Sequence, residues 1–229
     1  MKTISRRQFL YFSAFSIIMN RFSFVTAATQ KGCAEKANQY PLSVAVLKAA
    51  YKAEMIASKN YICCSGKALE DRYSNIAYLF AAFSLSEKIH ADNYKNLLKS
   101  LCADIKEPQI EIVISDTKSN LKKASDQELL KINKIYPDFI KKLEKESLNQ
   151  AVINCMYSWK SHRQHERKMR RVSRYAGFFF SGVAKKIEGE KFDFHVCEIC
   201  GSTIDESPKI PCEICNYPSF NYRKVIPPS

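Results

Sequence analysis

The sequence predicts a mainly α-helical protein, a four-helix bundle followed by a small cysteine-rich β domain. Apolar residues recur at alternating steps of three and four along long segments between about residues 45 and 172, as on the buried face of a helix. Only six glycines occur in 229 residues, as expected for long helices with short connections. After Gly177 the chain becomes rich in turn formers, and its cysteines become regularly spaced.

These changes in composition predict three parts. Residues 1–28 are expected to be an export signal, residues 40–176 the helical bundle, and residues 190–229 the four-cysteine domain. With 46% hydrophobic residues, the chain is long enough for one ordinary core and a small second unit.

The N-terminus has the residue order of an export signal. Arg6 and Arg7 precede the apolar run Phe9–Met19, and small residues suited to cleavage follow near Ala28. The paired arginines followed by Phe-Leu resemble a twin-arginine signal, which predicts a periplasmic protein. The alternative is an N-terminal membrane anchor facing the periplasm, although this run is too short to span a bilayer. Twin-arginine export carries folded proteins, often with a cofactor, so a metal site is expected.

Four amphipathic segments make up the predicted bundle. The first has Leu47, Tyr51, Glu54, Ser58 and Tyr61 on one face, and the second runs from Ile76 to Leu101. The third begins at about Ser119, with a bend expected at Tyr136-Pro137 because proline removes a helical hydrogen bond. The fourth extends from Val152 to Val172. Residues 106–116 are expected to form a loop or extended connection, and residues 177–196 a linker and an extended run.

Four C-terminal cysteines form two Cys-x2-Cys pairs, at Cys197, Cys200, Cys212 and Cys215. Two such turns can place four thiolates tetrahedrally around iron or zinc, and the spacing does not distinguish these metals. Two disulfides are the alternative. The other five cysteines, at 33, 63, 64, 102 and 155, are irregularly spaced. They predict no disulfide framework and mostly small core residues, with a redox role for the adjacent Cys63-Cys64 as the alternative.

Each bundle segment also carries a candidate metal ligand. They are Glu54 in the first, Glu87 and His90 in the second, Glu128 in the third, and His162 and His165 in the fourth. The spacing of three places Glu87 and His90 on one helix face. A glutamate buried alone would cost several kcal/mol, so one within an apolar stripe needs a partner. Taken singly, each could instead be an exposed surface residue.

Over about residues 45–220 the chain resembles the rubrerythrins. The motifs that carry the resemblance are Glu54 with Tyr61, "EKIH" with Glu87 and His90, Glu128 with Tyr136, and the paired Cys-x2-Cys. The resemblance implies a ferritin-like di-iron bundle followed by a rubredoxin-like or zinc-ribbon β domain. It further implies that Glu54, Glu87, His90, Glu128 and His165 bind iron in the bundle. His162 is also a candidate ligand, because imidazole can bind iron. The tyrosines would hydrogen-bond near that site, and together Glu54, Glu87, His90, Glu128, Tyr61 and Tyr136 would be the catalytic residues.

The function implied by the resemblance is reduction of hydrogen peroxide. Electrons would pass from a redox donor protein through the four-cysteine iron to the bundle iron. Members of this family commonly form dimers, so a homodimer is also expected.

Two positions depart from the family pattern. A second third-helix glutamate is replaced by Lys131, and the glutamate of the fourth-helix Glu-x-x-His motif is replaced by His162. Both changes make the site more positive and less able to hold two dications. The bundle could therefore hold one metal, a different metal such as zinc, or none, with Lys131 paired to a glutamate. The alternative function is a non-enzymatic metalloprotein with only the four-cysteine site occupied, used for electron carriage, metal handling or docking.

The formal charge of +13 raises nucleic acid as a partner. The basic residues of the fourth helix, such as Arg163 and Arg167, and a zinc-ribbon-like tail would suit that partner. A solvated helix face is the simpler interpretation, and an export signal removes the usual nucleic-acid partner. We therefore expect no nucleic acid.

Overall fold

The computed structural model describes residues 37–173 and 180–229, so the predicted export signal lies outside the described residues. The helices are α2 (Pro41–Glu70), α3 (Ser74–Ser100), α4 (Thr117–Leu130), the π-helix η1 (Lys131–Ile135), α5 (Tyr136–Glu144), α6 (Asn149–Ser173), α7 (Phe180–Glu188) and the 3-10 helix η2 (Ser219–Asn221). The strands are β1 (His195–Cys197), β2 (Thr203–Ile204) and β3 (Tyr222–Lys224).

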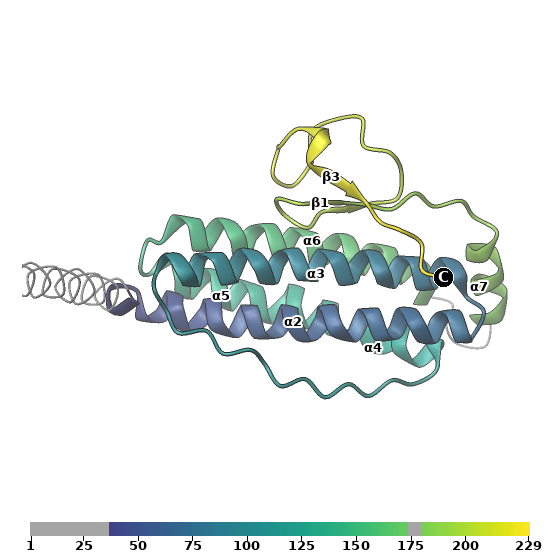
Figure 1. The fold of residues 1–229 in the computed structure, drawn as a ribbon, viewed down its shortest axis with the longest axis horizontal. Coiled ribbons are helices and arrows are strands. Elements are labelled where there is room, and N and C mark those ends of the chain that lie inside the picture. The colour runs from purple at the N-terminus through teal and green to yellow at the C-terminus, as the bar shows by residue number, and fades with distance from the viewer. Residues whose placement is uncertain (1–36, 174–179) are drawn as a thin grey trace, which may run out of the picture.

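The long helices lie side by side in a four-helix bundle (Figure 1). One position in the bundle is shared by α4, η1 and α5, which follow one another along the chain. The segment that connects α3 to α4 runs along the outside of the bundle (Figure 1). The predicted fold class, a helical bundle with a small C-terminal domain, is confirmed. No helix within the described ranges has the length and apolar character needed to cross a membrane.

Tertiary and local contacts satisfy the helix ends. Glu146, in the turn before α6, accepts hydrogen bonds from the amides of Leu42 (2.9 Å) and Ser43 (2.7 Å) at the start of α2. Asp116 caps α4, accepting a hydrogen bond from the Ser119 amide at 3.0 Å, as N-cap aspartates do. These contacts pair amides that have no partner within the helix itself.

The third bundle helix is irregular in the turn directly before Tyr136-Pro137, where the sequence predicts a bend. The backbone widens into a π-turn at Lys131–Ile135, and the Tyr136 amide bonds to the Lys131 carbonyl five residues back. Pro137 then lies in the first turn of α5, where its missing amide hydrogen leaves no partner unsatisfied. The helix therefore continues through Pro137, and the change from π- to α-helical hydrogen bonding falls at Tyr136, beside the predicted bend.

The C-terminal domain contains a three-stranded antiparallel sheet in the order β2-β1-β3, with Val196 opposite both Thr203 and Arg223. Before it, α7 occupies part of the segment expected to be a linker. Ala184 and Ile187 are buried three residues apart on α7 and join the same core cluster as Phe194. Phe180, Ala184 and Ile187 stand at steps of four and three, a helical spacing that the expectation of a linker overlooked.

Two apolar clusters fill the bundle on either side of a polar layer. Along α3, residues 76–83 belong to one cluster and Ala91, Tyr94 and Leu98 to the other. Glu87 and His90 lie between these two runs. The polar layer is therefore enclosed at both ends by packed apolar side chains.

Candidate metal centres

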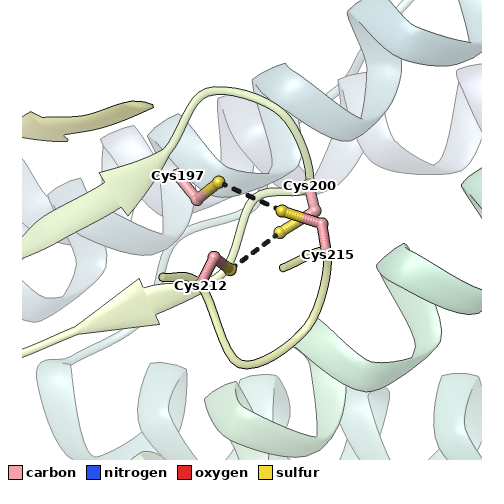
Figure 2. A group of neighbouring side chains, drawn as sticks. All are labelled: Cys197, Cys200, Cys212 and Cys215. Carbon is pink, nitrogen blue, oxygen red and sulfur yellow. Dashed lines mark hydrogen bonds between the residues drawn. The ribbon is translucent and has the colours of Figure 1, made fainter. Parts of the chain in front are cut away.

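The four C-terminal cysteines converge on one point (Figure 2). The Sγ atoms of Cys197 and Cys215 are 3.7 Å apart, and those of Cys200 and Cys212 are 3.5 Å apart. Metal–sulfur bonds of about 2.3 Å place the sulfurs of a tetrahedral site about 3.8 Å apart. All four are free thiols, so the disulfide alternative is wrong and the donors fit one metal ion.

Two equivalent backbone turns present these thiols. The Gly201 amide donates to the Cys197 carbonyl at 2.8 Å, and the Asn216 amide donates to the Cys212 carbonyl, also at 2.8 Å. Gly201 has φ 76° and Asn216 has φ 59°, in the left-handed region that glycine and asparagine tolerate best. Hydrogen bonds from Cys197 and Cys200 lower the pKa of the Cys212 thiol, which favours one thiolate before metal binds.

The bundle site consists of the six candidate ligands of the polar layer. Glu54, Glu87, His90, Glu128, His162 and His165 all have 1% or less of their surface exposed. The interpretation of the glutamates as surface residues is therefore wrong. Their donor atoms form two overlapping groups, each within 4.8 Å: Glu54, Glu87, His90 and His162 in one, and Glu87, Glu128, His162 and His165 in the other.

Histidine 162 lies between the two groups. Its Nε2 is 3.2 Å from Glu54 Oε1, and its Nδ1 is 2.8 Å from Glu128 Oε2. Burial and Lys131 lower the pKa of His162, but Glu87, Glu128 and Glu54 outweigh them and raise it to about 10. Burial lowers the pKa of His165, so that ring is neutral and can act as a ligand.

The two predicted tyrosines hydrogen-bond to carboxylates of the site. The Tyr61 hydroxyl donates to Glu128 Oε1 at 2.6 Å, and the Tyr136 hydroxyl donates to Glu54 Oε1. A third buried tyrosine, Tyr94, lies 3.3 Å from the Tyr136 hydroxyl and donates to Ser158 Oγ at 2.7 Å. Burial raises the pKa of all three hydroxyls, which keeps them protonated. Tyr94 was missed as a site residue, although it lies in the same α3 stripe as His90.

Lys131 projects into this site. Its Nζ is 2.8 Å from Glu54 Oε2 and 3.4 Å from Glu87 Oε1, and the residue is 8% exposed. Burial lowers the pKa of Lys131, but the three glutamates reverse this effect and raise it above its usual value. Burial likewise raises the pKa of Glu54, and Lys131 and His162 bring it well below the usual range. Lys131 therefore forms a buried ion pair with Glu54 and Glu87.

Three buried atoms of the bundle site lack a hydrogen bond. They are Glu128 Oε2, His162 Nδ1 and His165 Nδ1; the fourth such atom among the described residues is Ser43 Oγ. Glu128 Oε2 and His162 Nδ1 are 2.8 Å apart, but their orientation does not form a hydrogen bond. An unpaired buried polar atom costs about 1–3 kcal/mol. Three such atoms together indicate a position that fits a metal ion.

The four-cysteine domain packs directly on the bundle site. His90 Nε2 is 3.0 Å from the Cys200 carbonyl oxygen, and its Nδ1 is 3.0 Å from Glu87 Oε2. The Ser86 and Ser161 hydroxyls donate to the Gly201 carbonyl at 2.6 and 2.9 Å. His90 therefore contacts both sites. The two serines were missed because only the docked structure gives them a partner.

The remaining cysteines have different environments. Cys64 and Cys155 are buried free thiols, and Cys63 is an exposed free thiol. Cys102 is disulfide-bonded, contrary to the expectation for these residues. Cys63 and Cys64 are not joined to each other, so the structure shows no disulfide between them.

Comparison with known proteins places this arrangement in a family. The rubrerythrin family model matches residues 45–173. Rubrerythrin-2 of Clostridium acetobutylicum is 28% identical over 177 residues, covering 74% of this chain and 89% of that protein. Fully reduced, all-ferrous nigerythrin has a similar fold, with a TM-score of 0.68, 23% identity, and coverage of 80% of this chain and 86% of that chain. A Desulfovibrio desulfuricans bacterioferritin, described with a diiron site, has a TM-score of 0.60 at 17% identity, covering 68% of this chain and 91% of its own. More than half of the chain matches the family model, and the chain belongs to the rubrerythrin family.

Proposed function

We propose that this protein reduces hydrogen peroxide to water with electrons from a redox donor protein, using iron at both sites. The contact between His90 and Cys200 supports this proposal most directly, since it joins the two candidate metal centres within one chain. Nigerythrin, which shares the fold, is described in an all-ferrous state. Zinc remains the alternative at the four-cysteine site, because the same four thiolates bind either metal.

The residues around the bundle site suit this chemistry. Reduction of one hydrogen peroxide to two waters consumes two electrons and two protons, and bound iron supplies one-electron redox chemistry. Tyr61 and Tyr136 hold Glu128 and Glu54 in place through hydrogen bonds. The Lys131 ammonium adds a positive charge inside the site, beside the carboxylates of Glu54 and Glu87. The two apolar clusters limit access of bulk water.

Peroxide consumption by the iron-loaded chain tests the proposal. With a reduced donor under anaerobic conditions, wild-type protein should consume peroxide, and Glu87→Ala should abolish turnover because Glu87 belongs to both donor groups. Glu144→Ala, at an exposed position on α5, is the matched control and should retain wild-type turnover. Equal rates for Glu87→Ala and wild type would contradict the proposal.

The pairing of Lys131 with Glu54 and Glu87 favours a second candidate function. If the lysine excludes metal from the bundle, the protein is a non-enzymatic metalloprotein that uses only the four-cysteine site for electron carriage, metal handling or docking. That function predicts one tightly bound metal per four-cysteine site, none in the bundle, and no peroxide turnover. Metal content per chain separates the two candidates.

We also propose that the protein is exported and dimeric. The twin-arginine-like residues Arg6 and Arg7 support export, as does the disulfide at Cys102, since disulfides are typical of compartments outside the cytoplasm. If Arg6 and Arg7 belong to an export signal, replacing both by lysine should leave uncleaved precursor in the cytoplasm. If the N-terminus is a membrane anchor, the wild-type protein should instead be found at full length in the membrane fraction. Native mass spectrometry of the mature chain tests the dimer.

A further inference from the structure

We infer that the bundle holds a single metal ion, bound by Glu87, Glu128, His162 and His165, and that the Lys131 ammonium takes the place of a second ion beside Glu54. This inference depends on the proposed function only in requiring that the bundle bind metal. It assigns different roles to the two overlapping donor groups, which share Glu87 and His162.

Three of the four donor atoms are unpaired in the group that includes Glu128 and His165, and the fourth, Glu87 Oε1, has only a long contact of 3.4 Å with Lys131 Nζ. Glu128 Oε2, His162 Nδ1 and His165 Nδ1 are buried without a hydrogen bond. Glu87 Oε1 lies 3.5 Å from Nδ1 of both histidines. Ligands at about 2.1 Å from an ion and at right angles to each other would lie about 3 Å apart. The distances of 2.8 Å between Glu128 Oε2 and His162 Nδ1 and of 3.5 Å from Glu87 Oε1 to each Nδ1 are near that value. The donor atoms of all four residues lie within 4.8 Å of one another, so one ion can reach them after small movements.

The group that includes Glu54 and His90 is already paired within the protein. Glu54 Oε2 accepts from Lys131 Nζ at 2.8 Å, and its Oε1 accepts from the Tyr136 hydroxyl and lies 3.2 Å from His162 Nε2. Both ring nitrogens of His90 have partners, Glu87 on one side and the Cys200 carbonyl on the other. None of the atoms without a hydrogen bond belongs to Glu54 or His90.

The charge balance also favours one ion. Glu54, Glu87 and Glu128 contribute three negative charges, and Lys131 removes one of them. A single dication neutralises the remaining two, because histidines bind metal as neutral rings. A second dication would leave the buried layer with two excess positive charges, and the cost of burying an unpaired charge is several kcal/mol.

The structure gives Glu54 a supporting role in place of a ligand role. A metal-binding histidine commonly donates its second ring nitrogen to a carboxylate or hydroxyl that fixes the ring. Glu54 occupies that place for His162 Nε2, and Thr203 Oγ1 lies 3.3 Å from His165 Nε2. Both arrangements aim Nδ1 into the same point. Thr203 belongs to the C-terminal domain, so this domain also orients one ligand.

Metal stoichiometry and spectroscopy test the inference on the full chain loaded anaerobically with ferrous iron. Mössbauer spectra separate four-thiolate iron from iron bound by oxygen and nitrogen. We expect the two kinds in a one-to-one ratio, and after oxidation an uncoupled high-spin ferric EPR signal from the bundle. A two-to-one excess of oxygen- and nitrogen-bound iron in a spin-coupled pair would overturn the inference. So would the absence of bundle iron.

Matched glutamate variants locate the ion. Glu128→Gln should lose the bundle iron, whereas Glu54→Gln should retain the one-to-one ratio because Glu54 is not a ligand. The four-thiolate iron spectrum shows in each sample that the chain is folded. Loss of bundle iron from a folded Glu54→Gln protein would contradict the assigned ligand set.

Two lysine variants test whether Lys131 replaces an ion. Lys131→Glu should double the oxygen- and nitrogen-bound iron and convert the EPR signal to that of a coupled pair. Lys131→Met removes the charge without adding a ligand and should keep the one-to-one ratio. An unchanged iron content in Lys131→Glu would contradict the idea that the Lys131 ammonium takes the place of a second ion. Absence of peroxide turnover with a one-to-one ratio would reject the proposed function and leave this inference intact.

Discussion

At the scale of single residues, Lys131 determines the electrostatics of the polar layer. Its ammonium contacts Glu54 and Glu87, and all three side chains are 10% exposed or less. In metal-free protein, Lys131→Met should reduce the free energy of unfolding by about 3–5 kcal/mol, because removing one partner of a buried ion pair leaves a carboxylate uncompensated. Urea unfolding measures the loss. Lys134→Met, at an exposed position one helical turn away, should change it by less than about 0.5 kcal/mol.

The ion pair of Lys131 and Glu54 also predicts the pH range in which it stabilises the folded protein. The folded-state pKa of Lys131 is raised, so its contribution is present below the unfolded lysine value of about 10.4 and is lost as the pH rises through the folded value. The folded-state pKa of Glu54 is lowered, so its contribution is present above about pH 4.3 and is lost in acid. The difference between wild type and Lys131→Met should therefore be largest between about pH 5 and 10. A difference that grows below pH 4 would contradict this account.

Among the cysteines, exposure and pKa predict which thiol reacts. Cys63 is exposed, whereas burial raises the pKa of Cys64 to about 11 and that of Cys155 to about 12. Since the thiolate is the nucleophile, iodoacetamide at neutral pH should label Cys63 in the folded, metal-loaded protein and leave the other two unlabelled. Mass spectrometry of proteolytic peptides measures the modification. Labelling of Cys64 at the rate of Cys63 would revive a redox role for the adjacent pair.

At the scale of helices, the π-turn is held by a side chain from a neighbouring helix. Trp159 Nε1, on α6, donates to the Ile132 carbonyl within η1 at 2.9 Å. Trp159→Phe should reduce the free energy of unfolding by about 1 kcal/mol or more, through the lost hydrogen bond and lost contact. Hydrogen exchange should accelerate at residues 131–136 and stay unchanged in the middle of α2. Uniform acceleration through the bundle would show that Trp159 acts on global stability instead.

The long helices of the bundle could be predicted from the regular spacing of their apolar residues. Most of the site residues could be predicted because they are polar residues within those apolar stripes. Glu87 and His90 stand within an apolar stripe of α3, and all the candidate ligands proved to be buried. Lys131 was recognised as unusual because it stands where a carboxylate is expected. The π-turn could not be predicted, since Trp159 from another helix bonds within it. The α7 helix was missed, although Phe180, Ala184 and Ile187 have helical spacing. The contact of His90 with Cys200 likewise depends on how two distant segments dock.

At the scale of the whole molecule, the C-terminal domain is fixed on α3 and α6 by polar contacts. Asn93 Nδ2 donates to the Ile199 carbonyl at 2.8 Å, and Gln164 Oε1 accepts from Ser202 Oγ at 3.1 Å. Lys168 forms an ion pair with Asp205 at 2.9 Å. These contacts surround the point at which His90 meets Cys200, so the distance between the two metal centres depends on the docking.

Gly201 packs against His90 and Ser86 in that interface, and its substitution should separate the C-terminal domain from the bundle. A Cβ atom there would lie 2.3 Å from His90 Nε2 and 2.9 Å from Ser86 Oγ, and its φ of +76° disfavours other residues. Gly201→Ala should keep the four-cysteine iron but accelerate hydrogen exchange at residues 86–93, and it should slow oxidation of that iron by peroxide at least tenfold. Gly182→Ala is the control, because nothing lies within 4 Å of its Cβ. Equal oxidation rates in the two variants would show that electrons reach the bundle without the His90–Cys200 contact.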